Sequence, residues 1–453
     1  MAERVNSITV SNSVHAEWYV QGSHFKISTE ELTALLPEKK IPIVTYCRTG
    51  ARSRAAIIVL NAMGYKNTTN GINVDTIDEA KAYAAQKEAE KKNAESLPPC
   101  VTLTDRKARL QLKAQLKGHK DRVWSVAWSQ TGQYIASTSS DKTIRIWSQQ
   151  GQHVGNWNCV ASLDGVHSRT IRSISWSPNG KYLASCGFDG LICIWTYQDG
   201  EWECISQLEG HSNEVKALSW SVSGGLLASC GRDKSIWVWD TERGFECASV
   251  LHGHTQDVKK ILWHTEEDWL VSCSYDDTIK VWTEEEDDWY CTQTISAHTS
   301  TVWDACFNQN GSQLVSVSDD CSLKLYSVTR MPVTNNPTLV LCSSFSMAHA
   351  RTIFSVSWAL GGDLIVTGGA DDAINVFTLG ALGLDTSSDN EDVNMQEADN
   401  NETKNQPGIL THVLNHPNAH ESDVNCVAFH PKDKTILASA GDDNVVNVWQ
   451  LPA

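Results

Sequence analysis

Short runs in which apolar and polar residues alternate fill most of the chain after about residue 107. The runs VWSVAW at residues 123–128 and KTIRIW at residues 142–147 are two of them. Alternation with a period of two is typical of half-buried β-strands. Since such runs recur up to the C-terminus, we expect an all-β domain over residues 107–453.

This part of the chain also contains seven copies of one pattern, with a period in the forties. Each copy has a histidine, an aspartate 22 residues later (23 in the last copy), a hydroxyl residue four before the aspartate and an aromatic residue six after it. Repeats of this length predict a seven-bladed β-propeller of WD repeats. The pairs are His119 and Asp141, His167 and Asp189, His211 and Asp233, His254 and Asp276, His298 and Asp320, His349 and Asp371, and His420 and Asp443.

We expect the repeated residues to form one buried hydrogen-bond network in each blade, linking histidine, hydroxyl, aspartate and indole. Such an aspartate and histidine could also be catalytic, but their recurrence in every blade favours a structural role. Phe377 takes the aromatic position of the sixth copy and cannot donate a hydrogen bond, so the network there should be incomplete.

Two further segments complete the expected propeller. The run ARLQLKAQL, which begins at Ala108, should pair as the outer strand of the last blade and lock the two ends of the ring together. Residues 380–410, between the sixth and seventh copies, are rich in Asp and Glu and poor in apolar residues. This composition predicts a disordered insertion, with an acidic docking tail or phosphorylation at Ser387 and Ser388 as the alternative.

The formal net charge of −17 disfavours broad binding to nucleic acids or anionic membranes, so protein partners are expected. None of the 14 cysteines forms a C-x-x-C pair, and many end strand-like runs, which indicates small core residues rather than metal or cluster ligands. No signal pattern and no membrane-length apolar run is present, so we expect a protein of a reducing, soluble compartment without a cofactor.

Several runs are similar to the WD-repeat subunits of the cytosolic iron–sulfur protein assembly (CIA) targeting complex: LEGHSNEVKALSWS, SCGRDKSIWVWD, HTQDVKKILWH, SYDDTIKVW, EEEDDWYC and STVWDACF. The resemblance implies a cytoplasmic, non-catalytic adaptor, with the nucleus as a further compartment. Its partners would be other targeting-complex subunits, a hydrogenase-like iron–sulfur carrier and apo client proteins. A WD scaffold of another complex, such as a ubiquitin or chromatin assembly, is the alternative.

The repeat arithmetic also predicts which side chains surround the mouth of the propeller channel. We use the residues three and five after each histidine and the residue just before each aspartate. The last two positions bring cations from the second to fourth copies together with aromatic residues. We expect this basic patch to bind an acidic peptide or a terminal carboxylate, with Arg232 as the principal contact. The alternative is a wet surface on which these cations only balance Glu214 and Asp257. The predicted partner-binding residues are Arg232, Arg172, Lys216, Lys259, Trp303, Tyr275 and Trp124.

Residues 1–90 have a different sequence pattern. An apolar run at residues 41–46 is followed by a loop from Cys47 to Arg52 and then by the run AAIIVLNAMGY. This strand, loop and helix pattern resembles the catalytic half of a single-domain rhodanese, a small α/β sulfurtransferase. The resemblance implies that Cys47 carries the persulfide and that Arg48 and Arg52 bind the anionic donor. The segment is short for a whole rhodanese, so a degenerate domain or a wrongly joined gene model is the alternative. A linker is expected over residues 91–106.

Overall fold

A computed structural model describes residues 7–9, 15–19, 24–25, 43–47, 68–72, 109–149, 155–286, 288–332, 334–362, 364–380 and 409–452. The chain divides into two compact units, Met1–Cys100 and Val101–Ala453. Most of the expected linker and insertion lies outside the described residues.

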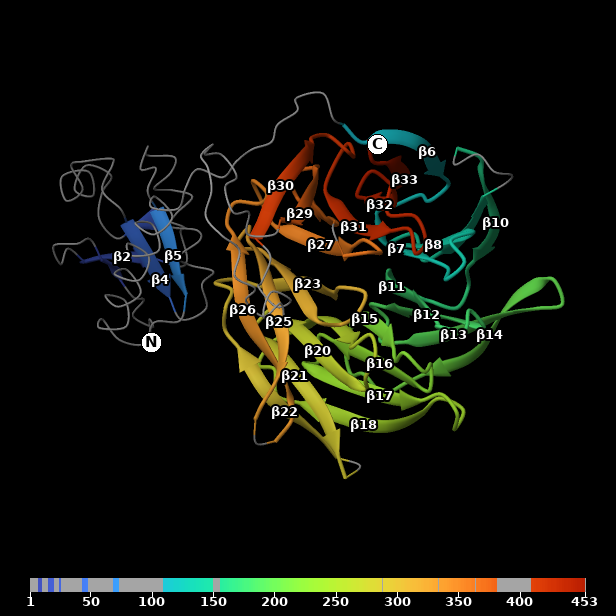
Figure 1. Ribbon diagram of the computed structural model, residues 1–453, viewed down its shortest axis with the longest axis horizontal. Coiled ribbons are helices and arrows are strands. Elements are labelled where there is room, and N and C mark those ends of the chain that lie inside the picture. The colour runs from blue at the N-terminus through green and yellow to red at the C-terminus, as the bar shows by residue number, and fades with distance from the viewer. Residues whose placement is uncertain are drawn as a thin grey trace, which may run out of the picture. The chain divides into compact units, whose positions relative to one another are not determined.

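The second unit contains seven four-stranded antiparallel sheets, arranged around a centre like the blades of a propeller (Figure 1). The innermost strand of each sheet follows the repeated histidine. The first four blades are β7 (Val123–Trp128), β8 (Tyr134–Ser139), β9 (Ile144–Gln149) and β10 (Trp157–Leu163); β11 (Ile171–Trp176), β12 (Tyr182–Gly187), β13 (Ile192–Gln198) and β14 (Glu201–Leu208); β15 (Val215–Trp220), β16 (Leu226–Gly231), β17 (Ser235–Asp240) and β18 (Glu246–His252); β19 (Val258–Trp263), β20 (Trp269–Ser274), β21 (Ile279–Glu285) and β22 (Asp288–Ile295).

The remaining three blades confirm the predicted seven-bladed fold. They are β23 (Val302–Phe307), β24 (Gln313–Ser318), β25 (Leu323–Arg330) and β26 (Pro337–Phe345); β27 (Ile353–Trp358), β28 (Leu364–Gly369), β29 (Ile374–Gly380) and β30 (Ile409–His416); and β31 (Val424–Phe429), β32 (Ile436–Gly441) and β33 (Val445–Gln450), joined by β6 (Gln111–Lys117).

Strand β6 closes the ring, as expected from the run at Ala108. It is the outer strand of the seventh blade, and Leu116 lies opposite Val446 in an antiparallel pair with β33. Figure 1 shows this first strand of the propeller beside the last one. The buried side chain of Leu116 packs in a cluster that includes Ile436 and Trp147, so β6 contributes to the core as well as to the ladder.

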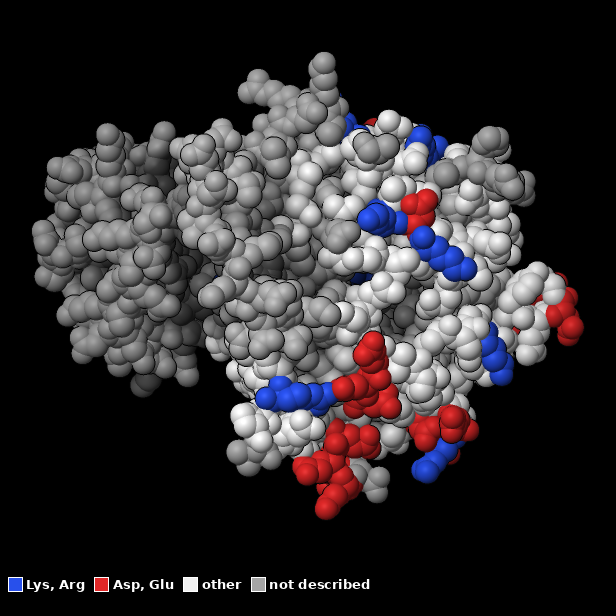
Figure 2. Space-filling view, in the orientation of Figure 1, with Lys and Arg blue, Asp and Glu red and all other residues white. Residues whose placement is uncertain are grey.

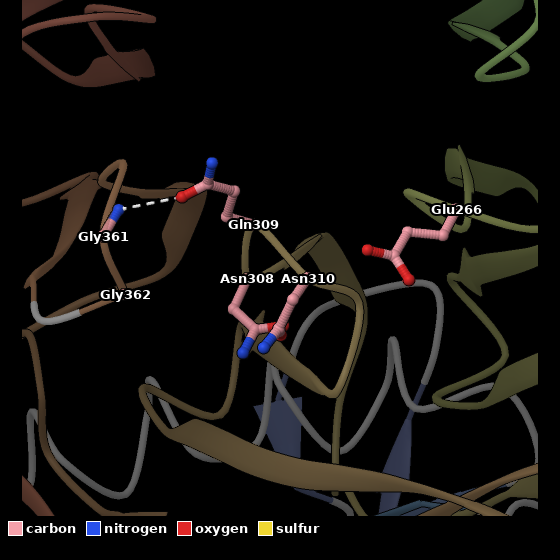
Figure 3. A pocket seen from close by; sticks show the side chains of 6 residues that line it. All are labelled: Glu266, Asn308, Gln309, Asn310, Gly361 and Gly362. Carbon is pink, nitrogen blue, oxygen red and sulfur yellow. Dashed lines mark hydrogen bonds between the residues drawn. The ribbon is translucent and has the colours of Figure 1, made fainter.

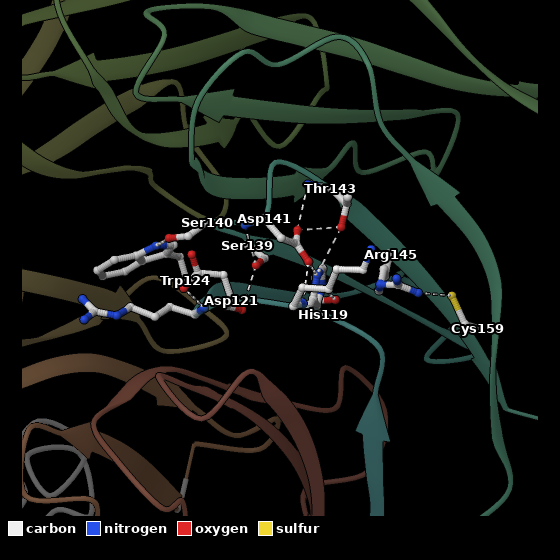
Figure 4. A network of polar contacts seen from close by, with 12 residues as sticks. His119, Asp121, Trp124, Ser139, Ser140, Asp141, Thr143, Arg145 and Cys159 are labelled. Carbon is white, nitrogen blue, oxygen red and sulfur yellow. Dashed lines mark hydrogen bonds and ion pairs between the residues drawn. The ribbon is translucent and has the colours of Figure 1, made fainter.

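The predicted network is present in the blades, and Figure 4 shows His119 and Asp141 of the first one. The histidine Nδ1 lies 2.8–3.0 Å from an aspartate oxygen in all seven blades, and Nε2 lies 2.6–2.9 Å from the serine or threonine hydroxyl. In five blades the tryptophan Nε1 donates to the same hydroxyl. As predicted, Phe377 leaves the sixth network incomplete, because its ring has no N–H. In the fifth blade, the buried hydroxyl group of Tyr326 has no hydrogen-bond partner in the described structure.

The blades are joined near the end of their inner strands by tryptophan side chains. Trp176 Nε1 donates to the carbonyl of Ala127 in the preceding blade, at 3.2 Å. Trp220 and Trp263 make the same bond to Ser175 and Ser219, and Trp128 makes it to Ala428 across the ring closure. A buried indole thereby satisfies its N–H and fixes the spacing between blades.

The first unit contains a sheet in the order β3-β2-β1-β4-β5, formed by β1 (Ser7–Thr9), β2 (His15–Tyr19), β3 (His24–Phe25), β4 (Ile43–Cys47) and β5 (Thr68–Ile72). Strands β4 and β5 are parallel, and the other pairs are antiparallel. The expected strand at residues 41–46 corresponds to β4, which ends at Cys47. Arg48, Arg52 and the helix expected after them lie outside the described residues.

Candidate functional site: the basic half of the channel mouth

Two loops of every blade meet at one face of the propeller, which we call the His–Asp face. The first loop joins the repeated histidine to the inner strand, and the second follows the second strand and carries the repeated aspartate. The backbone N–H before the aspartate donates to the carbonyl three residues after the histidine in all seven blades, at 2.8–3.0 Å. The repeat arithmetic therefore places the predicted mouth residues on one surface.

Cations and aromatic rings alternate along the mouth from the first blade to the fifth. The Cζ atom of Arg172 lies 5.0 Å from the Trp124 ring centroid, and Lys216 Nζ lies 4.1 Å from that of Phe188. Lys259 Nζ lies 5.1 Å from both the Tyr275 and the Trp303 ring centroids. Each of these cations comes from a different blade. The predicted cations and aromatic residues thus lie together, and burial lowers the pKa of Arg172, Lys216 and Lys259.

Arg232, in the third blade, does not stack on an aromatic ring in the described structure. Its NH1 atom lies 3.5 Å from Oε1 of Glu214, and 54% of its side chain is exposed. The buried carboxylate of Glu214 also contacts Lys216 Nζ at 2.6 Å and Arg169 NH2 at 3.2 Å. Burial alone would raise the pKa of Glu214, but Lys216 and Arg232 hold it below the usual value.

The sequence prediction did not include Arg169. This residue stands two places after His167, whereas the prediction used the positions three and five after each histidine and the position before each aspartate. The signal was present in the sequence, since Arg351 occupies the same position in the sixth repeat. Both arginines donate to the carbonyl just before their blade's aspartate, Phe188 O and Ala370 O.

The local ion pairs only partly balance this group of cations. Lys216 is paired with Glu214, and Lys259 with Asp257 at 3.2 Å, as the alternative of a balanced surface requires. However, the basic half, defined by Arg169, Arg172, Lys216, Arg232 and Lys259, has five cations for these two carboxylates. Three of these cations share Glu214, and Arg172 forms no ion pair in the described structure. The group lies within a chain of net charge −17.

The other half of the mouth is acidic. Asp319 accepts from Ser300 Oγ at 2.8 Å, and Asp442 accepts from Asn425 Nδ2 at 2.7 Å and pairs with Arg122. Burial raises the pKa of Asp423, with nearby Asp442 adding to the effect. The channel mouth is therefore electrostatically polarised between the second to fourth blades and the fifth to seventh.

A second group that sequence reasoning missed joins four inner strands below the mouth. Lys260 Nζ lies 2.8 Å from Oδ1 of the buried Asp304, whose Oδ2 accepts from Ser355 Oγ at 3.0 Å. Ser355 Oγ in turn accepts from the backbone of Val427 at 3.2 Å. Lys260, Asp304 and Ser355 each stand six places after their histidine, where the other repeats have Ser, Ala or Cys. The group links blades four to seven, and Asp304 raises the pKa of Lys260 despite its burial.

The opposite face has a different character. Acidic side chains gather around the tip of the β21–β22 hairpin in Figure 2, where Glu284, Glu285 and Asp288 are exposed. A shallow pocket of about 260 Å³ on this face is lined by residues from three inner turns, and Figure 3 shows Gly361 N–H donating to Gln309 Oε1 there. No Lys or Arg is among the described residues that line this pocket, so its chemistry differs from that of the basic half.

Known proteins share this architecture and its repeats. The WD domain, G-beta repeat, matches residues 110–148, 157–196, 202–240, 245–283, 289–327, 340–378 and 410–450. A probable cytosolic iron–sulfur protein assembly protein of Chlamydomonas reinhardtii is 51% identical over 360 residues, which are 74% of this chain and 97% of the relative. This chain belongs to that family of WD-repeat assembly proteins. Similarly named proteins of Aedes aegypti and Nematostella vectensis are 44% and 46% identical over 76% and 74% of this chain and 98% of each relative.

The family's name refers to iron–sulfur proteins, and iron–sulfur clusters are held by several cysteine thiolates that converge on one site. Cys186, Cys230 and Cys273 are buried at equivalent positions in three blades, and burial raises their thiol pKa. This confirms the expected core role for these three. In the described parts of the chain, no three His, Cys, Asp or Glu residues lie close enough to hold a metal. The same parts contain no helix long and apolar enough to span a membrane.

Proposed function

We propose that the protein is a non-catalytic adaptor of cytosolic iron–sulfur protein assembly, which bridges cluster-transfer machinery and apo client proteins. Relatives that carry the assembly name align over nearly their whole length. A propeller presents loops from many blades on one face, which suits simultaneous protein contacts rather than a single reaction. The protein acts in the cytosol, and we propose the nucleus as a second compartment.

Its partners in this proposal are other CIA targeting-complex subunits, a hydrogenase-like iron–sulfur carrier and apo iron–sulfur proteins. The basic half of the mouth is the proposed contact for an acidic segment or a terminal carboxylate of one of them. This group of five cations, whose ion pairs reach only two carboxylates in the described structure, carries this assignment within a chain of net charge −17. Arginine forks bind carboxylates through two parallel hydrogen bonds, and aromatic neighbours add contact area.

Affinity purification of the intact chain from its own cells, followed by mass spectrometry, tests the adaptor role. We expect cytosolic iron–sulfur assembly proteins among the recovered partners. Recovery of only ubiquitin or chromatin machinery by soluble, folded bait would favour the alternative WD scaffold. Peptides from residues 1–100 in the same sample would show that the first unit is part of the mature protein.

A second candidate function, sulfur transfer, rests on the Cys47–Arg52 spacing and on β4, which ends at Cys47. In this proposal Cys47 carries the persulfide, and Arg48 and Arg52 orient an anionic donor such as thiosulfate. Purified protein should then transfer sulfur from thiosulfate to cyanide, and Cys47→Ser should abolish the reaction. Equal rates for the two proteins would remove this function.

A further inference from the structure

Glu214 precedes β15 and gathers cations from two blades. Its Oε2 atom contacts Lys216 Nζ at 2.6 Å, and its Oε1 atom contacts Arg169 NH2 at 3.2 Å and Arg232 NH1 at 3.5 Å. Only 11% of the Glu214 side chain is exposed, whereas the two arginine side chains are more than half exposed. Two accessible guanidinium groups therefore share one buried carboxylate oxygen.

Two guanidinium groups repel each other unless an anion lies between them. Glu214 supplies that anion from below, and a bond from Arg169 NH1 to the carbonyl of Phe188 fixes this arginine further. Each guanidinium has five N–H groups, so both retain donors for an external ligand. Their shared anchor keeps the two forks side by side before a ligand arrives, which reduces the entropy lost on binding.

We infer that Arg169 and Arg232 form a two-guanidinium clamp for a carboxylate of the partner segment, with Glu214 as the positioning residue. This inference rests on the proposed function of the basic half and deepens it. Arg169 becomes a second contact residue beside Arg232, and Glu214, although negatively charged, favours the binding of an anion.

The junction between the sixth and seventh blades provides an internal comparison. Arg351 donates to Ala370 O and lies 3.5 Å from Oδ1 of Asp423, so it repeats the contacts of Arg169 with Phe188 and Glu214. The position equivalent to Arg232 is Asp442, a carboxylate. Among the described ion pairs, Asp423 binds only the guanidinium of Arg351, and Arg122 pairs with Asp442 instead. The second junction therefore has no two guanidinium groups on one carboxylate, and it supplies matched control variants.

The clamp is tested by the affinity of a fluorescein-labelled tetra-glutamate peptide for the full chain, measured by fluorescence anisotropy. Glu214→Gln removes a negative charge. If Glu214 only offset the charge of the cations, this variant would bind the acidic peptide more tightly than the wild type. The clamp predicts the opposite sign, a several-fold loss of affinity, while Asp423→Asn leaves the affinity nearly unchanged. Tighter or unchanged binding by Glu214→Gln, or no binding by the wild type, would overturn the inference.

Arg169→Ala gives a second measurement if Glu214→Gln lowers the melting temperature. It should weaken peptide binding several-fold, and Arg351→Ala should not; equal effects of the two would contradict the clamp. The adaptor role fails separately, through the absence of assembly proteins in the affinity purification. A chain that recovers those proteins but binds the peptide equally well after Glu214→Gln remains an adaptor without a clamp.

Discussion

At the scale of single residues, the serine of each complete network has one chemically consistent set of bonds when the histidine is neutral. The indole Nε1–H of Trp239 can only donate, so Ser229 Oγ accepts from it and donates its own proton to His211 Nε2. In this set of bonds the proton of a neutral His211 lies on Nδ1, which is 2.8 Å from Asp233. Burial alone would raise the pKa of Asp233, but His211 and the bonds from Ser235 hold it at about 2.

Ser229→Ala should destabilise the propeller more than Thr367→Val. Ser229→Ala removes the hydrogen-bond partner of two buried groups, His211 Nε2 and Trp239 Nε1. Thr367→Val removes the partner of His349 Nε2 alone, because Phe377 has no N–H group. An unsatisfied buried group costs about 1–3 kcal/mol, so we expect roughly twice the loss for Ser229→Ala. Thermal unfolding of both variants measures this; a larger effect of Thr367→Val would contradict the network.

How far the sequence predicts the site depends on whether a contact lies within one repeat. The His–Asp network and the mouth positions recur at fixed spacings, so they could be located from the sequence. The contacts of Glu214 with Arg169, and of Lys260 with Asp304, join different blades. Their geometry depends on how neighbouring blades pack, which no repeat spacing specifies.

At the scale of elements, closure through β6 could be predicted because the run at Ala108 has no other strand to pair with before the first histidine. The tryptophan bonds between blades were not predicted, since their acceptors are backbone carbonyls of another repeat. The acidic insertion and the helix expected after Cys47 fall on residues outside the described structure and stay predictions.

Deletion of residues 1–117 should open the ring, whereas deletion of residues 1–100 should leave it closed. The longer deletion removes β6, exposes the edge of β33 and uncovers the cluster around Leu116. We expect loss of cooperative thermal unfolding and aggregation only for the longer deletion. Equal melting temperatures for both truncated proteins would show that closure by β6 is dispensable.

At the scale of the whole molecule, the protein combines a net charge of −17 with a basic half mouth and an acidic half mouth. Such a surface repels anionic partners in general and admits an acidic segment in one orientation. Complementary charge of this kind increases association rates and selects orientation more than it adds affinity. Binding should therefore weaken with added salt.

Stability should decrease in two stages as the pH falls. Burial lowers the pKa of His119 and His298, so below about pH 6.5 the unfolded chain takes up protons that the folded chain does not. The network aspartates, whose pKa values are also lowered, retain their contribution until the pH falls below about 3.9 and then lose it. A melting temperature that is constant from pH 7 to pH 5 would contradict the first stage.

The central claim, that the basic half of the His–Asp face captures an acidic partner, is tested most directly by Arg232→Glu. Arg243→Glu is the matched control, because it makes the same charge change at a residue that follows β17, on the opposite face. Both variants should fold like the wild type. The account predicts that quantitative affinity purification recovers several-fold less of the iron–sulfur assembly partners with Arg232→Glu than with Arg243→Glu; equal recovery from two folded variants would contradict it.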